Sequence, residues 1–434
     1  MSSPRMQPHQ PSFLRTLFFG ALLSLACTRA EAQLTIDIVG VGAQQIPVVT
    51  SEFVGEAKNA ELLSSVIQAN LARSGVIKNV ANAGLPRTAE ATAEGYAAYA
   101  TRNADAAVVG SVTPSANGQF QVTFRLLDVP KKTQLAGLVY NVSAAEMRAT
   151  AHRISDVIYE KLTGDRGVFS TRLAYVSKTG ARFQLIVADS DGVNAISIVS
   201  SNEPIISPAW APDGVRLAYV SFENRKPSIY VQNVSTGTRQ LLVNARGNQS
   251  APAWSPDGRS IVFASSQAGG TQLFIVGADG TGSRRLTTNA NVIDTAPNWA
   301  SDGKIYFMSD RGGSPQVYRI DPNGGNAERV TFEGGENANP KVAADGKSMV
   351  FVKREGSRYA LAIQDFASRQ VQVLTQGPVD ESPSFAPNGK LIVYASIYNG
   401  RGVLAAVSAD GRVKQRLASS GADVREPAWG PLPR

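Results

Sequence analysis

One short segment recurs through the C-terminal two-thirds of the chain. It reads SPAWAPDGVRLAYVS from Ser207 and APAWSPDGRSIVFAS from Ala251, and the later copies keep its opening proline. These prolines lie 44, 45, 43, 43 and 44 residues apart, at Pro208, Pro252, Pro297, Pro340, Pro383 and Pro427. Such a period is typical of a β-propeller, in which each repeat forms one four-stranded blade. The repeat therefore predicts six blades.

Within each of the first five copies, a short strand leads into a turn built around Asp-Gly or Asn-Gly. Asp can bond its own backbone and Gly accepts a positive φ, so a hairpin should follow. We interpret the acids Asp213, Asp257, Asp302 and Asp345 as turn residues rather than a calcium ladder. The regular aromatic residues fit packing between blades better than a ligand-stacking cage. They are Trp210, Trp254, Trp299, Phe385 and Trp429.

The repeats are out of phase at the two ends of the propeller region. The region opens near Leu173 with a second strand that lacks its own first strand, and it closes with a first strand at Pro427 to Trp429. A ring in which the last segment completes the first blade leaves no open sheet end. We therefore expect residues 165–434 to form a propeller closed by the C-terminal strand.

The region before the propeller has a different pattern. Alternating apolar residues suggest strands at LTIDIV and IPVV, and helical spacing is found at Ala57 to Arg73. Further helices are expected at Ala93 to Arg102 and Ala144 to Leu162, and strands at 106–112 and 119–129. Residues 33–164 are thus predicted to form an α/β domain, joined to the propeller by a short linker.

The first 32 residues have the features of a secretion signal. Arg5 and Arg15 precede an apolar run from Leu17 to Ala26, and Ala30-Glu31-Ala32 is a small-x-small cleavage pattern. We expect cleavage before Gln33, although Cys27 leaves a lipoprotein signal as an alternative. A run this short does not span a bilayer, so no direct membrane insertion is expected.

The mature chain has few residues suited to enzyme chemistry. Cleavage would remove the only cysteine and lower the formal charge from +8 to +6, without a long basic run, so nucleic-acid binding has little support. No G-x-S-x-G nucleophile motif is present, and no nucleotide-binding fingerprint has its required context. His152 remains as the single histidine, which is too few ligands for a usual zinc site. We interpret His152 as a helix-surface or domain-contact residue, and we expect no catalytic residues, no metal and no cofactor.

Several segments together carry a resemblance to one known family. They are VVGSVTP at Val108 to Pro114, EKLTG at Glu160 to Gly164, RLAYVS from Arg172 and VDESPSFAPNGK from Val379. In order and spacing they are similar to the TolB family of the Tol-Pal envelope system. The resemblance implies a monomeric periplasmic protein that binds the lipoprotein Pal through its propeller and TolA through its N-terminus. It also implies roles in outer-membrane integrity and constriction at cell division, and leaves room for other envelope partners.

The resemblance places candidate binding residues at two locations. Loops that enter the innermost strands should gather at one mouth of the channel and bind Pal. They carry Glu203, Asn248, Thr295, Asn339, Glu381 and Glu426.

The expected TolA-binding segment comprises Gln33, Leu34, Thr35, Ile36, Asp37, Ile38 and Val39. The residues alone favour an ordinary first strand of the α/β sheet there, whereas the resemblance favours a segment that docks or is released. Two alternative functions stay open, namely direct binding of peptidoglycan or carbohydrate and a propeller-type hydrolase.

Overall fold

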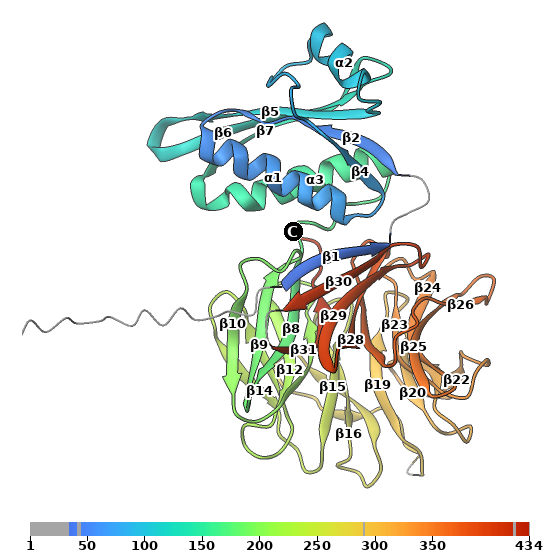
Figure 1. Ribbon diagram of the computed structural model, residues 1–434. Helices are drawn as coiled ribbons and strands as arrows, with labels where there is room; N and C mark the ends of the chain where they lie inside the picture. The colour runs from blue at the N-terminus through green and yellow to red at the C-terminus, as the bar shows by residue number, and fades with distance from the viewer. Residues whose placement is uncertain (1–33, 41–44, 290, 420–421, 434) are drawn as a thin grey trace, which may run out of the picture. The chain divides into compact units, whose positions relative to one another are not determined.

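The computed structural model of the protein describes residues 34–40, 45–289, 291–419 and 422–433 (Figure 1). The predicted leader and Gln33 lie outside this part of the chain. All contacts given below belong to the unit that spans Ala32 to Arg434. No helix within the described ranges combines the length and the apolar character that a membrane span requires.

Within residues 45–163, the N-terminal domain is a mixed sheet with three α-helices. Its strands follow the order β4-β2-β5-β6-β7, and β3 lies beside β5. The first pairings, between β2, β4 and β5, are parallel, and β5, β6 and β7 form an antiparallel meander. The strands are β2 (Ile46–Thr50), β3 (Val54–Gly55), β4 (Ile77–Val80), β5 (Ala106–Pro114), β6 (Gln119–Asp128) and β7 (Thr133–Ser143). The helices are α1 (Ala57–Arg73), α2 (Ala93–Ala100) and α3 (Met147–Thr163).

The two faces of this sheet are covered by different helices (Figure 1). Alternate side chains of β5 point to opposite faces, because successive residues of a strand do so. Val108 joins the cluster formed with α1 and α3, which includes Leu63 and Ile154. Val109 instead packs in a cluster with Tyr99 of α2. This alternation explains why β5 is buried on both faces.

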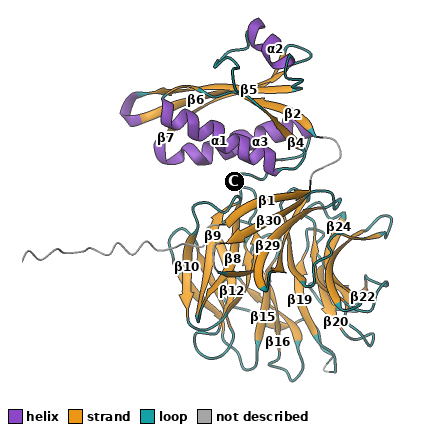
Figure 2. Cartoon of the chain, viewed as in Figure 1, coloured by secondary structure: helices purple, strands orange, loops and turns teal. Residues whose placement is uncertain are grey.

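The propeller contains strands and loops but no helix in its described part, as Figure 2 shows by colour. Six sheets form its blades, which we number in chain order. Blade 1 holds β8 (Arg172–Thr179), β9 (Arg182–Asp189), β10 (Ile196–Ser201) and β31 (Asp423–Trp429). Blade 2 holds β11 (Ile205–Trp210), β12 (Arg216–Ser221), β13 (Ser228–Asn233) and β14 (Arg239–Val243). Blade 3 holds β15 (Gln249–Trp254), β16 (Ser260–Ser265), β17 (Gln272–Gly277) and β18 (Arg284–Arg285).

The remaining three blades follow the same plan. Blade 4 holds β19 (Asp294–Trp299), β20 (Ile305–Ser309), β21 (Gln316–Ile320) and β22 (Glu328–Arg329). Blade 5 holds β23 (Asn337–Val342), β24 (Ser348–Glu355), β25 (Arg358–Asp365) and β26 (Val371–Val373). Blade 6 holds β27 (Asp380–Phe385), β28 (Leu391–Tyr398), β29 (Arg401–Ser408) and β30 (Lys414–Ser419). The predicted class, an α/β domain followed by a six-bladed propeller, is confirmed.

The first blade combines strands from both ends of the propeller region. β31 pairs antiparallel with β8, with Trp429 opposite Leu173. The indole Nε1 of Trp429 donates to Oγ1 of Thr171 over 2.8 Å. Its main-chain N–H donates to Oγ of Ser384 in blade 6 over 2.9 Å. The C-terminal strand therefore bonds to the blades on both sides of the ring junction.

The first strand of the chain, β1 (Leu34–Gly40), does not join the α/β sheet. It pairs antiparallel with β30 and becomes the fifth strand of blade 6, as Figure 1 shows. The expectation from the residues alone, a first strand of the N-terminal sheet, is wrong at this position. Alternating apolar residues predict a strand but carry no information about which edge it will find.

Candidate functional site

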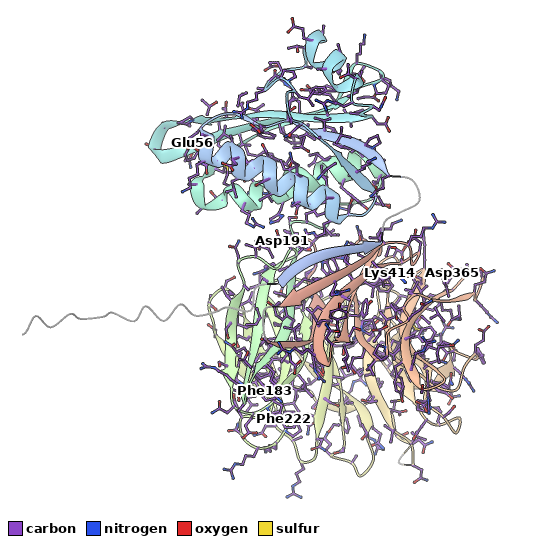
Figure 3. All side chains as sticks on the ribbon, in the orientation of Figure 1. Glu56, Phe183, Asp191, Phe222, Asp365 and Lys414 are labelled. Carbon is purple, nitrogen blue, oxygen red and sulfur yellow. The ribbon has the colours of Figure 1, made fainter. Side chains whose placement is uncertain are left out.

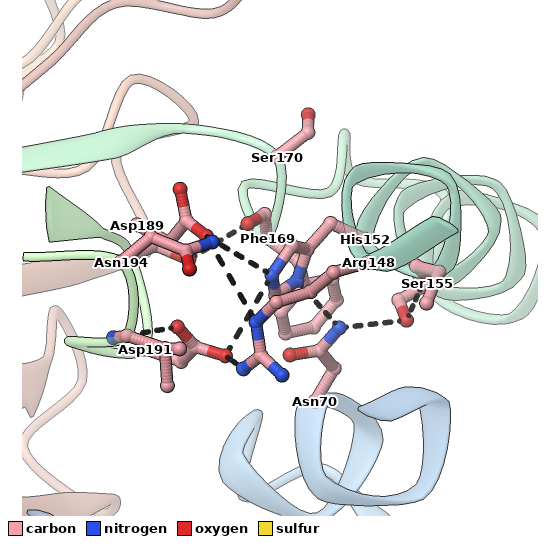
Figure 4. A network of polar contacts seen from close by, with 12 residues as sticks. Asn70, Arg148, His152, Ser155, Phe169, Ser170, Asp189, Asp191 and Asn194 are labelled. Carbon is pink, nitrogen blue, oxygen red and sulfur yellow. Dashed lines mark hydrogen bonds and ion pairs between the residues drawn. The ribbon is translucent and has the colours of Figure 1, made fainter. Parts of the chain in front are cut away.

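His152 lies in α3 at the contact between the α/β domain and blade 1 (Figure 4). Its ring is 2% exposed, and its Nδ1 lies 2.9 Å from Nδ2 of Asn70 on α1. On its other side, Nε2 lies 3.6 Å from Oδ2 of Asp191 and 3.9 Å from Oδ2 of Asp189. Both aspartates belong to the propeller, at and just after the end of β9; Asp191 is also labelled in Figure 3. Of the two roles that the sequence suggested for His152, the structure shows the domain contact.

Two arginines complete this network. Arg148 lies one helical turn before His152 and forms a close ion pair with Asp191. Arg73, at the end of α1, donates to Oδ1 of Asn70 over 3.1 Å and to Oγ of Ser190 over 3.2 Å. The network therefore joins both long helices of the α/β domain to a single propeller turn.

Burial and charge set the protonation of these groups. Burial lowers the pKa of His152 to about 4, although Asp191 opposes this change. Burial alone would raise the pKa of Asp191, but Arg73, His152 and Arg148 outweigh it and hold that pKa below its usual value. At neutral pH the network thus contains a neutral imidazole beside an ionised Asp191.

The same three residues, His152, Asp189 and Asp191, are close enough to hold a metal ion, with ligand atoms within 4.8 Å of one another. Hydrogen bonding argues against that chemistry. Because Arg73 fixes Oδ1 of Asn70 as an acceptor, Nδ2 of Asn70 must donate to Nδ1 of His152. The neutral ring then carries its proton on Nε2, whereas a metal would need a lone pair there. The cluster is therefore suited to ion pairing between domains.

The linker between the domains is held by Asp156 of α3. Its carboxylate accepts the N–H groups of Phe169 and Ser170 over 2.6 and 3.2 Å. The chain passes so close to α3 that a Cβ on Gly167 would lie 2.3 Å from the Cα atom of Asp156. The linker sequence thus requires glycine at this position for steric reasons.

The propeller channel has two distinct ends. Strands within a blade are antiparallel, so every inner strand begins at one end and every Asp-Gly turn lies at the other. We call these the entry mouth, where the loops before β11, β15, β19, β23, β27 and β31 lie, and the turn end. Asp189 and Asp191 follow a third strand and therefore lie at the turn end. The predicted Pal-binding residues belong to the opposite end, the entry mouth.

Those predicted residues do not form a ring of equivalent loop tips. Glu203 and Asn248 are exposed and precede their inner strands. The other four are half-buried within inner strands: Thr295 in β19, Asn339 in β23, Glu381 in β27 and Glu426 in β31. The expectation that all six lie in loops is wrong, because the inner strands begin earlier than the repeated proline suggests.

Each inner strand also contains a strained residue directly before its proline. These residues have φ between 48° and 54°, and the pairing register shifts around each of them. They are Ser207, Ala251, Ala296, Asn339, Ser382 and Glu426. A left-handed conformation costs a non-glycine residue roughly 1–2 kcal/mol. This ring was not predicted from the sequence, although each of its residues directly precedes the repeated proline.

Glu426, a member of this ring, interacts with charged side chains from other blades. Burial and the neighbouring Glu381 raise the pKa of Glu426, whose carboxylate also accepts the N–H of Ser207 and interacts with Lys341. Burial lowers the pKa of Lys341, while Glu426 opposes this. Thus two of the predicted Pal-binding residues, Glu381 and Glu426, are electrostatically linked.

The repeated aromatic and acidic residues have structural roles. The indole Nε1 of Trp254 donates to the carbonyl of Ala209 in the preceding blade over 3.0 Å, and Trp210 reaches Ala428 over 3.2 Å. Asp213 accepts the N–H groups of Val215 and Arg216 in its own turn. Packing between blades and turn formation, the two expected roles, are confirmed for these residues.

Comparison with known proteins gives the family of the chain. Residues 159–433 match the family described as the TolB beta propeller domain, and residues 34–135 match the TolB amino-terminal domain. The Tol-Pal system protein TolB of Bordetella pertussis is 45% identical over 431 residues, which cover 97% of each chain. The chain belongs to the TolB family. A solved TolB structure from Acinetobacter baumannii agrees, with 36% identity and a TM-score of 0.84 over 92% of this chain and 100% of that one.

Membership of the TolB family confirms the resemblance that the sequence carried and identifies a Tol-Pal system protein with a propeller. In this TolB family chain, the domain contact at Arg73, Arg148 and Asp191 was not found from the sequence. The isolated His152 and the DSDG turn from Asp189 were its only signals in the sequence. Residues that are brought together by tertiary packing share no local sequence pattern.

Proposed function

We propose that this TolB family protein is a non-catalytic periplasmic binding component of the Tol-Pal system. It binds Pal through the entry mouth of the propeller and TolA through the segment from Gln33 to Val39. The observation that carries this proposal is the position of β1 as an added fifth strand on the outer edge of blade 6.

An added edge strand is suited to exchange between partners. Within the described residues β1 pairs with β30 alone, and its register shifts between Ile38 and Gly40. Main-chain hydrogen bonds supply the affinity when a strand is added to a sheet edge. A strand of a partner protein can therefore replace β30 as the hydrogen-bonding partner of β1. Gln33 lies outside the described residues. In this proposal, the pairing of β1 with β30 represents the docked form of the TolA-binding segment.

Exposed apolar side chains support a protein-binding role for the entry mouth. They lie at the entry-mouth end of blades 3 to 6. Some belong to the loops that lead into inner strands, and the others to hairpins between second and third strands, which lie at the same end. They are Ile293, Phe332, Tyr359, Ile397 and Tyr398, with Phe332 69% exposed. Exposed apolar groups rimmed by polar residues are typical of protein interaction surfaces. The six predicted Pal-binding residues lie at the same end.

The geometry of His152 supports a role without catalysis. Its Nε2 faces two carboxylates and its Nδ1 is engaged by Asn70, and within the described residues no serine is hydrogen-bonded to either ring nitrogen. Docking and release of β1 would let Pal control access to TolA, provided that Pal binds the two arrangements with different affinity.

Calorimetry with purified partners tests the proposal. Deleting Gln33 to Val39 should abolish TolA binding while leaving Pal affinity within about tenfold, or about 1.4 kcal/mol. A parallel pull-down with purified cell wall distinguishes Pal binding from direct peptidoglycan or carbohydrate binding. Persistent TolA binding by the deleted protein would show that the segment is purely structural, and retention on cell wall without Pal would favour the carbohydrate alternative.

A further inference from the structure

Outer strands of several blades carry a side chain that reaches the next blade. Gln240 on β14 donates to the main-chain carbonyl of Asp279 over 2.9 Å. Gln372 on β26 donates to the carbonyl of Asp410 over 3.2 Å. In the strand pairing, Gln240 lies opposite Val231 and Gln372 lies opposite Ile363. Each acceptor belongs to the turn after the third strand of the following blade, so this bond joins consecutive blades.

Arg284 on β18 makes the same connection with a longer side chain. It lies opposite Ile275, and its Nη2 donates to the carbonyl of Pro322 over 2.6 Å. The position is therefore used repeatedly in the propeller with different residue types. What stays constant is the acceptor, a carbonyl in the turn of the next blade.

Gln415 on β30 occupies this position in blade 6 but has a different partner. It lies opposite Ala406, and the next blade in the ring is blade 1, whose corresponding turn holds Asp189 and Asp191. Instead of a carbonyl in that turn, Nε2 of Gln415 donates to the main-chain carbonyl of Arg73 at the end of α1. Gln415 is 4% exposed, so this is a buried contact. The connection between blades is redirected to the α/β domain.

Close packing surrounds this redirected bond. A Cβ on Gly75 would lie 2.4 Å from Cγ1 of Val413, so the chain after α1 rests directly against the residue that precedes β30. The side chain of Arg73 reaches Ser190 in the blade 1 turn, and its guanidinium carbon lies 5.7 Å from the ring centre of Phe169 in the linker. The end of α1 thus contacts blade 6, blade 1 and the linker together.

The strand that Gln415 anchors is also the strand that holds β1. In the register of the pair, Ile38 lies opposite Gln415, and Asp37 lies opposite Arg416. We infer that Gln415 is a positioning residue that couples the domain contact to the docking of β1. With Gln415 bound to Arg73, β30 is held in the position that pairs with β1; when this bond is lost, β1 is released more readily. By linkage, release of β1 loosens the domain contact to the same extent.

This coupling concerns contacts within the chain and does not depend on which partner takes β1. If the protein does not bind TolA or Pal, the coupling is not contradicted. If the coupling is not found, the proposed binding of TolA and Pal is not contradicted. The two proposals can therefore be tested separately.

Hydrogen exchange of the chain from Gln33 onward tests the coupling. Gln415→Ala should speed exchange of the amides in residues 34–40 by about fivefold, the change expected for the loss of one hydrogen bond. Gln372→Ala removes the equivalent bond between blades 5 and 6 and should leave residues 34–40 unchanged. The amides of β17, in blade 3, serve as the reference for global opening in each variant.

Equal exchange of residues 34–40 in the Gln415→Ala and Gln372→Ala proteins would overturn the coupling. If Gln415→Ala speeds exchange in β17 as well, Gln415→Asn takes its place, because it keeps a polar side chain but is too short to reach Arg73. Faster exchange of residues 34–40 alone in that variant supports the coupling, and unchanged exchange there overturns it.

Discussion

The amide Nδ2 of Asn70 lies 2.9 Å from Nδ1 of His152 and thereby fixes how the domain contact is protonated. The bond joins α1 to α3 and leaves the proton of the neutral imidazole on Nε2, the atom that faces Asp191. The contact between the domains thus depends on a histidine held neutral by burial. This arrangement makes the stability of the protein dependent on pH in a defined range.

We expect acid to destabilise the protein through His152. Its pKa is about 4 in the folded protein and 6.5 ordinarily, so between these values the unfolded chain binds more protons. The free energy of unfolding should therefore fall as pH drops from 6.5 towards 4, by at most about 3 kcal/mol from this residue. Urea unfolding at intervals of pH measures this loss.

The variant His152→Gln isolates that contribution, because its side chain does not titrate. Its free energy of unfolding should be lower than that of the parent at pH 7 but should change less between pH 6.5 and 4. Parallel pH profiles for the two proteins would contradict the assignment. Because the pKa of Asp191 is lowered, its contribution to stability is lost only below the ordinary pKa of an aspartate. Its titration therefore does not overlap the range between pH 6.5 and 4.

A second prediction concerns the linker glycine. Gly167→Ala places a Cβ 2.3 Å from the Cα atom of Asp156, which cannot move without disturbing α3. Overpacking of this kind costs about 1–3 kcal/mol, which urea unfolding should detect. Gly335→Ala is the matched control, because a Cβ there meets nothing within 4 Å, and it should change stability by less than about 0.5 kcal/mol. Equal stability of the two variants would show that the linker is not held against α3.

Much of the fold follows from local patterns in the sequence. The helix expected from Ala57 to Arg73 has those bounds in α1, because its apolar spacing and its flanking cap residue Glu56 both act locally. The phase offset between the repeats places a first strand at the C-terminus, and β31 is the strand that pairs with β8. By contrast, β7 (Thr133–Ser143) was not expected, since most of its side chains are exposed and its apolar residues do not alternate cleanly.

The candidate sites were less accessible to sequence reasoning. The pairing of β1 with β30 joins residues separated by nearly the whole chain, and edge selection depends on tertiary structure. The network around His152 likewise draws on α1, α3 and a propeller turn. The sequence predicts loops at the six mouth residues, whereas inner strands such as β19 begin at Asp294, before Pro297.

The entry mouth offers a third test. Thr295→Trp adds a large side chain at a half-buried position of β19 and should weaken Pal binding at least about tenfold, or 1.4 kcal/mol, by steric exclusion. Asn248→Trp, at the entry to blade 3, and Glu381→Trp, in blade 6, test two further blades on the same grounds. Ser235→Trp is the control, since Ser235 is exposed at the turn end. Calorimetry should show normal affinity for that control, and normal affinity for all three mouth variants would move the interface elsewhere.

The last prediction concerns the closing strand. A chain that ends at Asp423 lacks nearly all of β31, which leaves β8 as a bare inner edge and removes Val424 and Trp429 from the core they share with Leu173 and Tyr175. Each blade of a ring contacts two neighbours, so opening the ring at blade 1 also exposes the adjoining face of blade 6. The cooperative thermal transition of the propeller should then be lost, as calorimetry would show by a broad or absent peak. A chain that ends at Pro431 keeps β31 and should retain the transition, and an unchanged melting temperature in the shorter chain would disprove closure by this strand.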